Sequence, residues 1–316
     1  MVVVAIMTIT YYLLNPLFII LISPLFMGII KKIKAMAQGR TGAPVWQPYF
    51  TLHKLFKKEI IYSENSSFIM KIAPYLNIGF TIGAATMVPV LFLPPEGAVP
   101  ANVILFLYLM VSARFFMALA GLDAGSGFGG MGSSREMSLS AIAEPVTIIT
   151  FAAIAFVLNT TDITRMFGAT VTNSLMEFPT LLLTGVSLFI ILIIETARIP
   201  VDNPETHLEL TMVHEAMIIE QSGPNLALME ISHAVKQTLY MAVLINLLFP
   251  MGMSDSFTFT GIALGMASFT VKGSILCMII AIFETSLAKI RFFRLPSFFM
   301  VALFLSFVTI VFELIL

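Results

Sequence analysis

The chain has 316 residues, of which 58% are hydrophobic and 11% are charged, and its formal net charge is −1. Soluble domains carry about 25% charged residues, so the composition excludes a soluble protein and predicts an all-α integral membrane protein. The near-zero net charge excludes a nucleic-acid-binding protein. The one cysteine, Cys277, can form no intrachain disulfide and cannot hold an iron–sulfur cluster alone. The single cysteine therefore predicts neither a disulfide nor an iron–sulfur cluster held by this chain alone.

About eight apolar stretches are long enough to cross a bilayer, because about 20 helical residues span about 30 Å of hydrocarbon. The sequence contains no internal repeat and no second domain, so it predicts a single polytopic membrane domain over residues 1–316. The predicted spans are residues 3–30, 72–94, 101–123, 138–158, 179–198, 226–250, 259–285 and 297–316.

Lysine and arginine are distributed unevenly between the two ends of these spans. Loop 31–71 holds eight of the 17 basic residues, whereas Arg165 is alone on the opposite side. The positive-inside rule therefore predicts a multi-pass protein of the cell membrane with both termini outside. The loops predicted to be cytoplasmic are 31–71, 124–137, 199–225 and 286–296.

Loop 31–71 contains the segment PYFTLHKLFKKEI at residues 48–60, which has apolar residues on one face and lysines on the others. This pattern predicts an amphipathic helix at the membrane surface. Binding of anionic lipid and docking of a partner both remain open, and we favour docking because glycines and prolines shape the approach. The residues that we expect to contact a partner are Arg40, Lys54, Lys57, Lys58, Arg135, Arg198, Arg291 and Arg294.

Two short motifs resemble known sites without the context that those sites need. Gly125, Gly127 and Gly130 match a dinucleotide fingerprint, but a membrane span precedes them in place of a strand. His214 and Glu215 begin a zinc-protease motif, but Ile218 stands where the second histidine ligand would be. We therefore predict no nucleotide site and no metal site here.

The stretch from Ile193 to Gly223 holds six of the 18 acidic residues. Pro200 and Pro204 predict a turn after a membrane helix, followed by a second helix that continues to Glu220. On a helical period the carboxylates of Glu205, Glu209 and Glu220 fall within roughly 60° of one another. Crowded carboxylates raise one another's pKa, so this face is typical of a proton-handling surface.

Ionisable side chains inside a membrane cost several kcal/mol and usually face a bundle interior. The alternative is a static ion pair between neighbouring helices, and for Arg114 and Lys272 that alternative stays open. The residues that we predict to relay protons are Glu144, Glu195, Asp202, Glu205, Glu209, Glu215, Glu220, His214, Glu230, Lys236, Lys272 and Glu284.

Four segments, in the same order along the chain, resemble the signatures of the respiratory complex I membrane subunit that closes the quinone chamber, subunit 1. They are GRTGAP at 39–44 with QP at 47–48 and LFKKE at 55–59, GGMGSSRE at 129–136, ETARIPVDNPE at 195–205, and KIRFFRLP at 289–296. One departure stands out, because residues 201–223 read VDNPETHLELTMVHEAMIIEQSG where complex I has an acid-rich segment of the type FDLPEAESEL. This form is similar to the homologous subunit of membrane-bound [NiFe] hydrogenases of the formate hydrogenlyase type.

The resemblance implies hydrogenase-like large and small peripheral subunits docked on the cytoplasmic loops, and antiporter-like membrane subunits beside this chain. It also implies that iron–sulfur clusters and any NiFe centre belong to those partners. We therefore expect a non-catalytic, ion-translocating subunit that couples a ferredoxin-linked hydrogenase-type complex to proton movement. The alternatives are the same role in a sulfur-reducing sister complex, a quinone site as in complex I, a free-standing ion transporter, and a purely structural anchor. The sequence leaves open the terminal electron acceptor and whether Na⁺ also moves.

Overall fold

A computed structural model describes residues 2–95, 97, 99–172, 178–202, 212–253 and 258–315. In these ranges the regular structure is helical, apart from isolated bridge residues such as the pair Asn102 and Asp162. The predicted all-α class is therefore confirmed. The helices are α1 (Val2–Ala37), α2 (Gln47–Phe56), α3 (Phe68–Met87), α4 (Val103–Asp123), α5 (Gly127–Val157), α6 (Ile163–Thr172), α7 (Leu181–Glu195), α8 (His214–Ile218), α9 (Gly223–Leu248), α10 (Phe259–Ser286), the 3₁₀ helix η2 (Phe292–Arg294) and α11 (Leu295–Ile315).

Six helices in the described part of the chain are long and apolar enough to cross a membrane, namely those at Met7–Ala37, Phe68–Met87, Val103–Asp123, Gly127–Val157, Thr260–Ser286 and Phe292–Ile315. The chain is thus a multi-pass membrane protein. Helix α7 is apolar but has 15 residues. Helix α9 is continuous over 26 residues, but its apolar sequence is interrupted by the ionisable residues Glu230, His233 and Lys236. The predicted number of eight spans stays a prediction.

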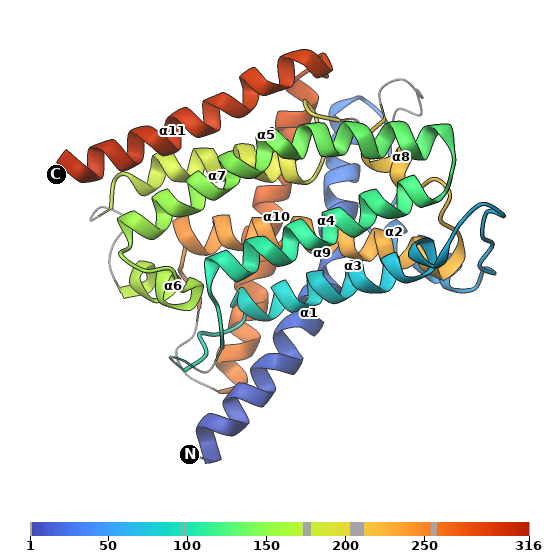
Figure 1. The fold of residues 1–316 in the computed structure, drawn as a ribbon. Coiled ribbons are helices and arrows are strands. Elements are labelled where there is room, and N and C mark those ends of the chain that lie inside the picture. The colour runs from blue at the N-terminus through green and yellow to red at the C-terminus, as the bar shows by residue number, and fades with distance from the viewer. Residues whose placement is uncertain are drawn as a thin grey trace.

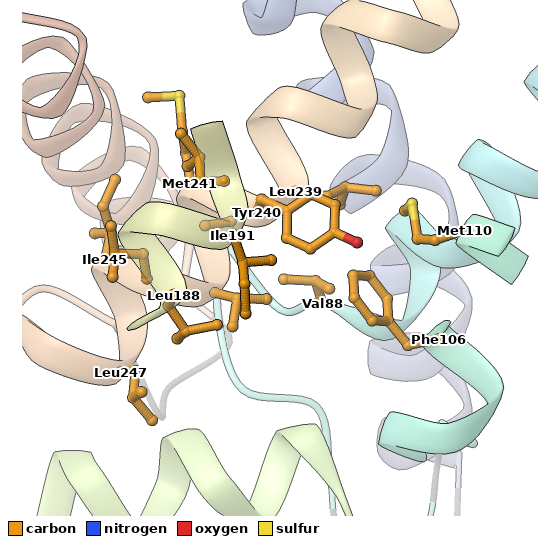
Figure 2. Packing of buried hydrophobic residues seen from close by; sticks show 14 of the residues in the cluster. Val88, Phe106, Met110, Leu188, Ile191, Leu239, Tyr240, Met241, Ile245 and Leu247 are labelled. Atoms are coloured by element: carbon orange, nitrogen blue, oxygen red, sulfur yellow. The ribbon is translucent and has the colours of Figure 1, made fainter. Parts of the chain in front are cut away.

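Helix α9 is the centre of the bundle and packs against α1, α3, α7 and α10. Every residue from Gln237 to Leu247 is buried, as expected for a helix that is enclosed on all sides. Figure 2 shows this half of α9 against α7 and α4, with Tyr240 facing Phe106 and with Leu188 and Ile191 nearby. The ionisable residues Glu230, His233 and Lys236 lie before or at the middle of α9, and this part borders the site described below.

The loops that were predicted to be cytoplasmic gather at one end of the bundle. Figure 1 shows α2, α8 and the turn between α4 and α5 at this end, and α6 and the C-terminus at the opposite end. Two contacts tie separate loops together there: Ile290 N donates to Pro200 O (3.0 Å), and Lys289 Nζ contacts Asp202 Oδ1 (2.7 Å). Which side of a membrane this end faces stays a prediction.

The predicted amphipathic segment is helical as α2, with no buried residue, but its helix ends at Phe56 rather than at residue 60. The reason is that the following residues pack on the start of α9. The Ser222 hydroxyl accepts from Ile61 N and donates to Ile61 O, each at 2.8 Å. A Cβ on Gly223 would meet Glu59 O at 2.6 Å, so this close approach of two backbones requires glycine.

A non-helical segment follows α3 inside the bundle. The proline at 89 disfavours helix at Val88, and Val88, Val90 and Leu91 are buried. The Asn15 amide of α1 satisfies this backbone: its Nδ2 donates to Ala85 O and Val88 O (both 2.9 Å), and its Oδ1 accepts from Val90 N (3.0 Å). Non-helical backbone at membrane depth needs such internal partners.

Replacing Asn15 by Leu should therefore lower the free energy of unfolding by about 1–3 kcal/mol for each backbone group left without a partner. Thermal unfolding of the purified protein in detergent measures the loss. Asn65→Leu, at an exposed loop position, is the matched control and should change the midpoint little. Equal midpoints for the two variants would contradict the assigned role of Asn15.

Candidate functional site

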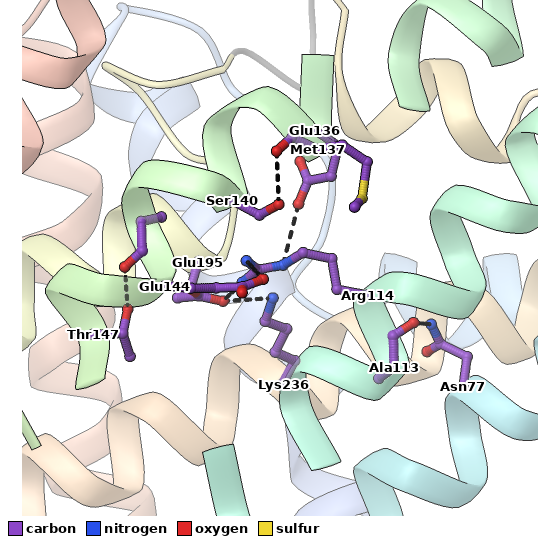
Figure 3. A network of polar contacts seen from close by, with 11 residues as sticks. Asn77, Ala113, Arg114, Glu136, Met137, Ser140, Glu144, Thr147, Glu195 and Lys236 are labelled. Carbon is purple, nitrogen blue, oxygen red and sulfur yellow. Dashed lines mark hydrogen bonds and ion pairs between the residues drawn. The ribbon is translucent and has the colours of Figure 1, made fainter. Parts of the chain in front are cut away.

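One group of interior charges is a set of five residues from four helices, here called the inner cluster: Arg114, Glu136, Glu144, Glu195 and Lys236. Arg114 Nε lies 3.3 Å from Glu136 Oε1, and its Nη1 lies 3.5 Å from Glu144 Oε1. Its Nη2 contacts Glu195 Oε2, which also accepts from Lys236 Nζ at 2.8 Å. Figure 3 shows the guanidinium group between the carboxylates of α5 and α7, with Lys236 of α9 beside it.

The inner cluster holds three carboxylates and two cations, so ordinary ionisation leaves one excess negative charge. The side chains of Arg114 and Glu195 are 5% and 2% exposed, whereas that of Glu144 is 33% exposed. Burying an unbalanced charge costs free energy. The excess negative charge is therefore carried by the most exposed of the three carboxylates, Glu144. Glu144 is therefore the group of this cluster best placed to gain and lose a proton.

A second group of charges lies nearer the α2 end of the bundle and is here called the outer cluster: Lys34, Arg198, Asp202, Glu284 and Lys289. Glu284 accepts from Arg198 Nη1 at 2.9 Å and lies 3.4 Å from Lys34 Nζ. Asp202 binds Lys289 through Oδ1 and accepts from Val213 N through Oδ2 at 3.0 Å. These contacts join α1, α10 and the segment that follows α7.

The chain reversal after α7 directs Glu195 and Arg198 into different clusters. Helix α7 ends in a Schellman motif: Ala197 N donates to Ile194 O and Arg198 N donates to Ile193 O, each at 3.1 Å. Ala197 occupies the left-handed position with φ 46°, which usually takes glycine and costs an alanine roughly 1 kcal/mol. Because of this tight reversal, Glu195 remains on the inner side and Arg198 turns to the outer side.

Four cavities follow one another across the bundle near these clusters. The α1–α2 pocket, of about 150 Å³, is lined by Lys31 and Glu230 among others. The outer pocket, of about 80 Å³, also contains Lys31 and Glu230 and extends to Arg198. The inner pocket, of about 30 Å³, contains Arg114 and Glu195.

The fourth cavity, the lateral pocket, lies between α4 and α5 and has a volume of about 350 Å³. It is lined by Arg114, Glu144, Glu195 and Tyr240, and by apolar residues such as the exposed Ile148. Each cavity thus shares charged or polar residues with the next. The series leads from the α1–α2 pocket through both clusters to the face between α4 and α5.

Most of the residues predicted to relay protons lie along this series. Glu144, Glu195 and Lys236 belong to the inner cluster, and Asp202 and Glu284 to the outer cluster. The outer pocket is also lined by His214, Glu215 and Glu230.

Four predicted relay residues, Lys272, Glu220, Glu205 and Glu209, are not part of the series as described. Lys272 is elsewhere, where its Nζ donates to Phe249 O at 2.8 Å and to Met251 O. Glu220 lies in the turn after α8, because the predicted helix covers only His214–Ile218 in the described part of that segment. Glu205 and Glu209 lie outside the described residues, so the predicted arc of three carboxylates stays a prediction for those two members.

The predicted docking residues fall into an exposed group and a group that is wholly or partly buried. Arg40, Lys54, Lys57, Lys58, Arg291 and Arg294 are exposed. Arg198, in contrast, is 5% exposed and donates to Glu284 and to Gln237 Oε1. Arg135 is half-buried, and its Nη1 donates to Met212 O at 2.9 Å. The burial of Arg198 contradicts a docking role, because the reversal at Ala197 turns its side chain inward.

Sequence reasoning missed Lys34, Glu136 and His233 as members of the site, and left Arg114 open. Lys34 was counted only as loop charge, although it lies in the last turn of α1. Glu136 lies just before the predicted span 138–158, and the glycine-rich segment did not indicate that the helix begins as early as Gly127. The spacing of His233, three positions from both Glu230 and Lys236, is visible in the sequence, but His233 was not included among the predicted relay residues.

Comparison with known proteins agrees with this architecture. The family model described as NADH dehydrogenase matches residues 9–314. Hydrogenase-4 component C of Escherichia coli (strain K12) is 29% identical over 286 residues, which cover 89% of this chain and 88% of the relative. Formate hydrogenlyase subunit 4 of the same organism is 29% identical over 285 residues, which cover 90% and 92%.

A solved structure also shares the fold. It is described as the membrane-bound sulfane sulfur reductase, an archaeal respiratory membrane complex, and one of its chains superposes with a TM-score of 0.80. The match covers 97% of this chain and 99% of the other at 19% identity. At this identity the likeness establishes the fold.

The buried ion pairs predict that Arg114→Met lowers the free energy of unfolding by about 3–5 kcal/mol, because three carboxylates then lose their shared partner. The double change Arg114→Met with Glu195→Met should be less harmful, since it removes one of the orphaned charges as well. Melting temperatures in detergent measure both. Arg165→Met, at an exposed arginine, is the control, and a double variant less stable than the single one would contradict the charge balance.

A pH dependence follows from Glu215 in α8. Burial, and secondarily the Glu230 carboxylate, raise the pKa of Glu215 from 4.5 to about 7. The folded protein therefore binds more protons than the unfolded chain between these values, and the stability from this group is lost as pH rises through 7.

The melting temperature should accordingly fall between about pH 5 and about pH 8, and Glu215→Gln should remove part of that fall because glutamine does not titrate. Scans of both proteins in the same detergent make the comparison. The exposed Glu64→Gln should keep the dependence of the unchanged protein. A Glu215→Gln profile identical to it would count against the raised pKa.

Proposed function

We propose, on the premise that this chain belongs to the NADH dehydrogenase family, that it is the membrane-anchoring and energy-coupling subunit of a complex I-related, hydrogenase-type respiratory complex. The observation that carries the proposal is the series of four pockets, with its inner and outer clusters of buried charges. The names of the two relatives, a hydrogenase component and a formate hydrogenlyase subunit, support the type of complex.

The coupling that we propose is electrostatic. A ferredoxin-linked redox reaction occurs in a docked partner and changes charge near the α1–α2 pocket or the outer cluster. Charges interact strongly across a poorly hydrated interior, so the change alters the proton affinity of Glu215 and then of the inner cluster. The members of such a cluster titrate together. A proton taken up by the outer pocket is thereby driven toward Glu144 and the lateral pocket.

Docking of the peripheral part is assigned to the exposed basic residues of the loops at the α2 end, namely Arg40, Lys54, Lys57, Lys58, Arg291 and Arg294. Trp46 and Phe50 of the same region are also largely exposed, at 59% and 62%. Exposed aromatic side chains beside arginines are typical of protein interfaces, and the lysines add positive charge at the rim of this surface. Hydrogenase-like large and small subunits are the proposed partners here, and antiporter-like subunits are proposed beside the membrane helices.

A second candidate is the same coupling role in a complex that reduces sulfur compounds. The fold match to a chain of the membrane-bound sulfane sulfur reductase favours it. The two candidates differ in the partner that carries the redox chemistry, and the part assigned to the residues of this chain is the same.

The test is Glu144→Gln in the assembled complex, in inverted membrane vesicles. With reduced ferredoxin as donor, proton movement per turnover should fall at least about tenfold, because glutamine cannot exchange the proton. An acridine dye reports the pH gradient, and oxidation of reduced methyl viologen reports the peripheral redox reaction, which should persist.

The matched control is Glu313→Gln. Glu313 is also in a membrane helix, but its carboxylate accepts from Thr180 Oγ1 at 3.1 Å and lies near the C-terminus, at the end of the bundle opposite α2 (Figure 1). This variant should pump normally. If Glu144→Gln pumps as well as Glu313→Gln, the inner cluster is structural and the proposed coupling role fails.

A further inference from the structure

Two histidines lie side by side between the inner and the outer pocket. His214 begins α8, and His233 lies in the first half of α9. Their ring centroids are 4.2 Å apart, with an angle of 40° between the ring planes. Both rings line the outer pocket, and both also line the inner pocket. The pair is therefore a shared wall of two cavities that hold different sets of charges.

The two sides of this wall differ in chemistry. On the outer side lie carboxylates that include Glu215 and Glu230. On the inner side lies Lys236, which is bound to Glu195. A proton that travels from the outer carboxylates to the inner cluster thus meets the imidazole rings between them.

Neutral imidazole has one nitrogen that donates a hydrogen bond and one that accepts. Burial lowers the pKa of His214, which favours this neutral form in the resting protein. A neutral ring can take a proton on its free nitrogen and release the proton of its other nitrogen. The passage leaves no net charge on the ring, which is then in its other tautomer, and a rotation of the ring restores the starting state.

The two rings are carried by helices of very different length and attachment. His233 is fixed on the long, largely buried helix α9. His214 is on a helix of five residues that is attached through Val213 N to Asp202, at 3.0 Å, and Asp202 in turn binds Lys289. A change of charge at the outer cluster therefore acts on the segment that carries His214.

We propose that the His214–His233 pair is the proton-transfer junction between the outer and the inner pocket. This inference rests on the proposed coupling function and names the residues that connect its two clusters. A simple stacking role is the alternative, in which the rings only fill space between α8 and α9. Phenylalanine would serve that role equally well, whereas it can neither accept nor release a proton.

The test uses the complete complex in inverted vesicles, with proton movement measured per turnover of reduced ferredoxin and normalised to the content of assembled complex. His214→Phe and His233→Phe keep an aromatic ring, and His214→Gln and His233→Gln keep hydrogen-bonding capacity. All four should lower proton movement per turnover at least about tenfold. His53→Gln, at the exposed histidine of α2, is the matched control and should have no effect.

Chemical rescue separates proton transfer from packing. The truncated variant His233→Ala should regain part of its proton movement when free imidazole is added at millimolar concentration, because imidazole can enter the vacated space and carry the proton. The His233→Phe variant should not respond, since its space is filled. Proton movement that persists in the Phe variants, or His233→Ala vesicles that imidazole leaves unchanged, would overturn the junction.

The outcome also distinguishes this inference from the function on which it rests. If Glu144→Gln abolishes coupling and the histidine variants pump normally, the junction is wrong and the coupling role stands. If neither set affects proton movement, both proposals fail. Should a histidine variant assemble poorly, His233→Asn, which retains a nitrogen near the Nδ1 position, repeats the measurement with a smaller change in shape.

Discussion

The burial of the Arg114 guanidinium is the constraint on which the rest of the interior depends. An arginine cannot release its proton at any accessible pH, so in a membrane interior it must be surrounded by carboxylates. Those carboxylates come from α5 and α7, and Glu195 brings Lys236 of α9 with it. One side chain of α4 thereby fixes the relative positions of four helices. The excess of carboxylates that this requires is also what makes the inner cluster able to hold a proton.

Helix α9 has two halves with different tasks. Its second half is buried on every side and packs into the core, as Figure 2 shows for Tyr240, Met241 and Ile245. Its first half places Glu230, His233 and Lys236 at successive turns, and these three residues face successive pockets. Because the second half is tightly packed, it also fixes the position of the first half, which carries the ionisable residues. The charges of α9 are therefore held in place although they lie in a poorly solvating interior.

The sequence predicted the helical class, the membrane location and most of the charged residues of the site, because each rests on a local property. Hydrophobic stretches identify helices, and an interior carboxylate such as Glu144 is conspicuous in such a stretch. The partners of these charges could not be predicted, because Arg114 and Glu195 are far apart in the sequence and meet only through packing. Arg198 was misassigned to a surface for the same reason, since the reversal at Ala197 uses an alanine where a glycine would have signalled it. His233 was passed over because its role depends on His214, which belongs to another helix.

The division between the two clusters follows from three residues of backbone. Glu195 is the last residue of α7 and Arg198 is the second residue past its cap, and the left-handed turn between them sends the two side chains in opposite directions. A helix that continued straight would have placed Glu195 and Arg198 on one face, three positions apart, where they would neutralise each other. The reversal prevents that pairing, so each charge must find partners on other helices. Separating this acid from this base creates two clusters that can differ in protonation, and any coupling between them has to pass through the residues that lie between.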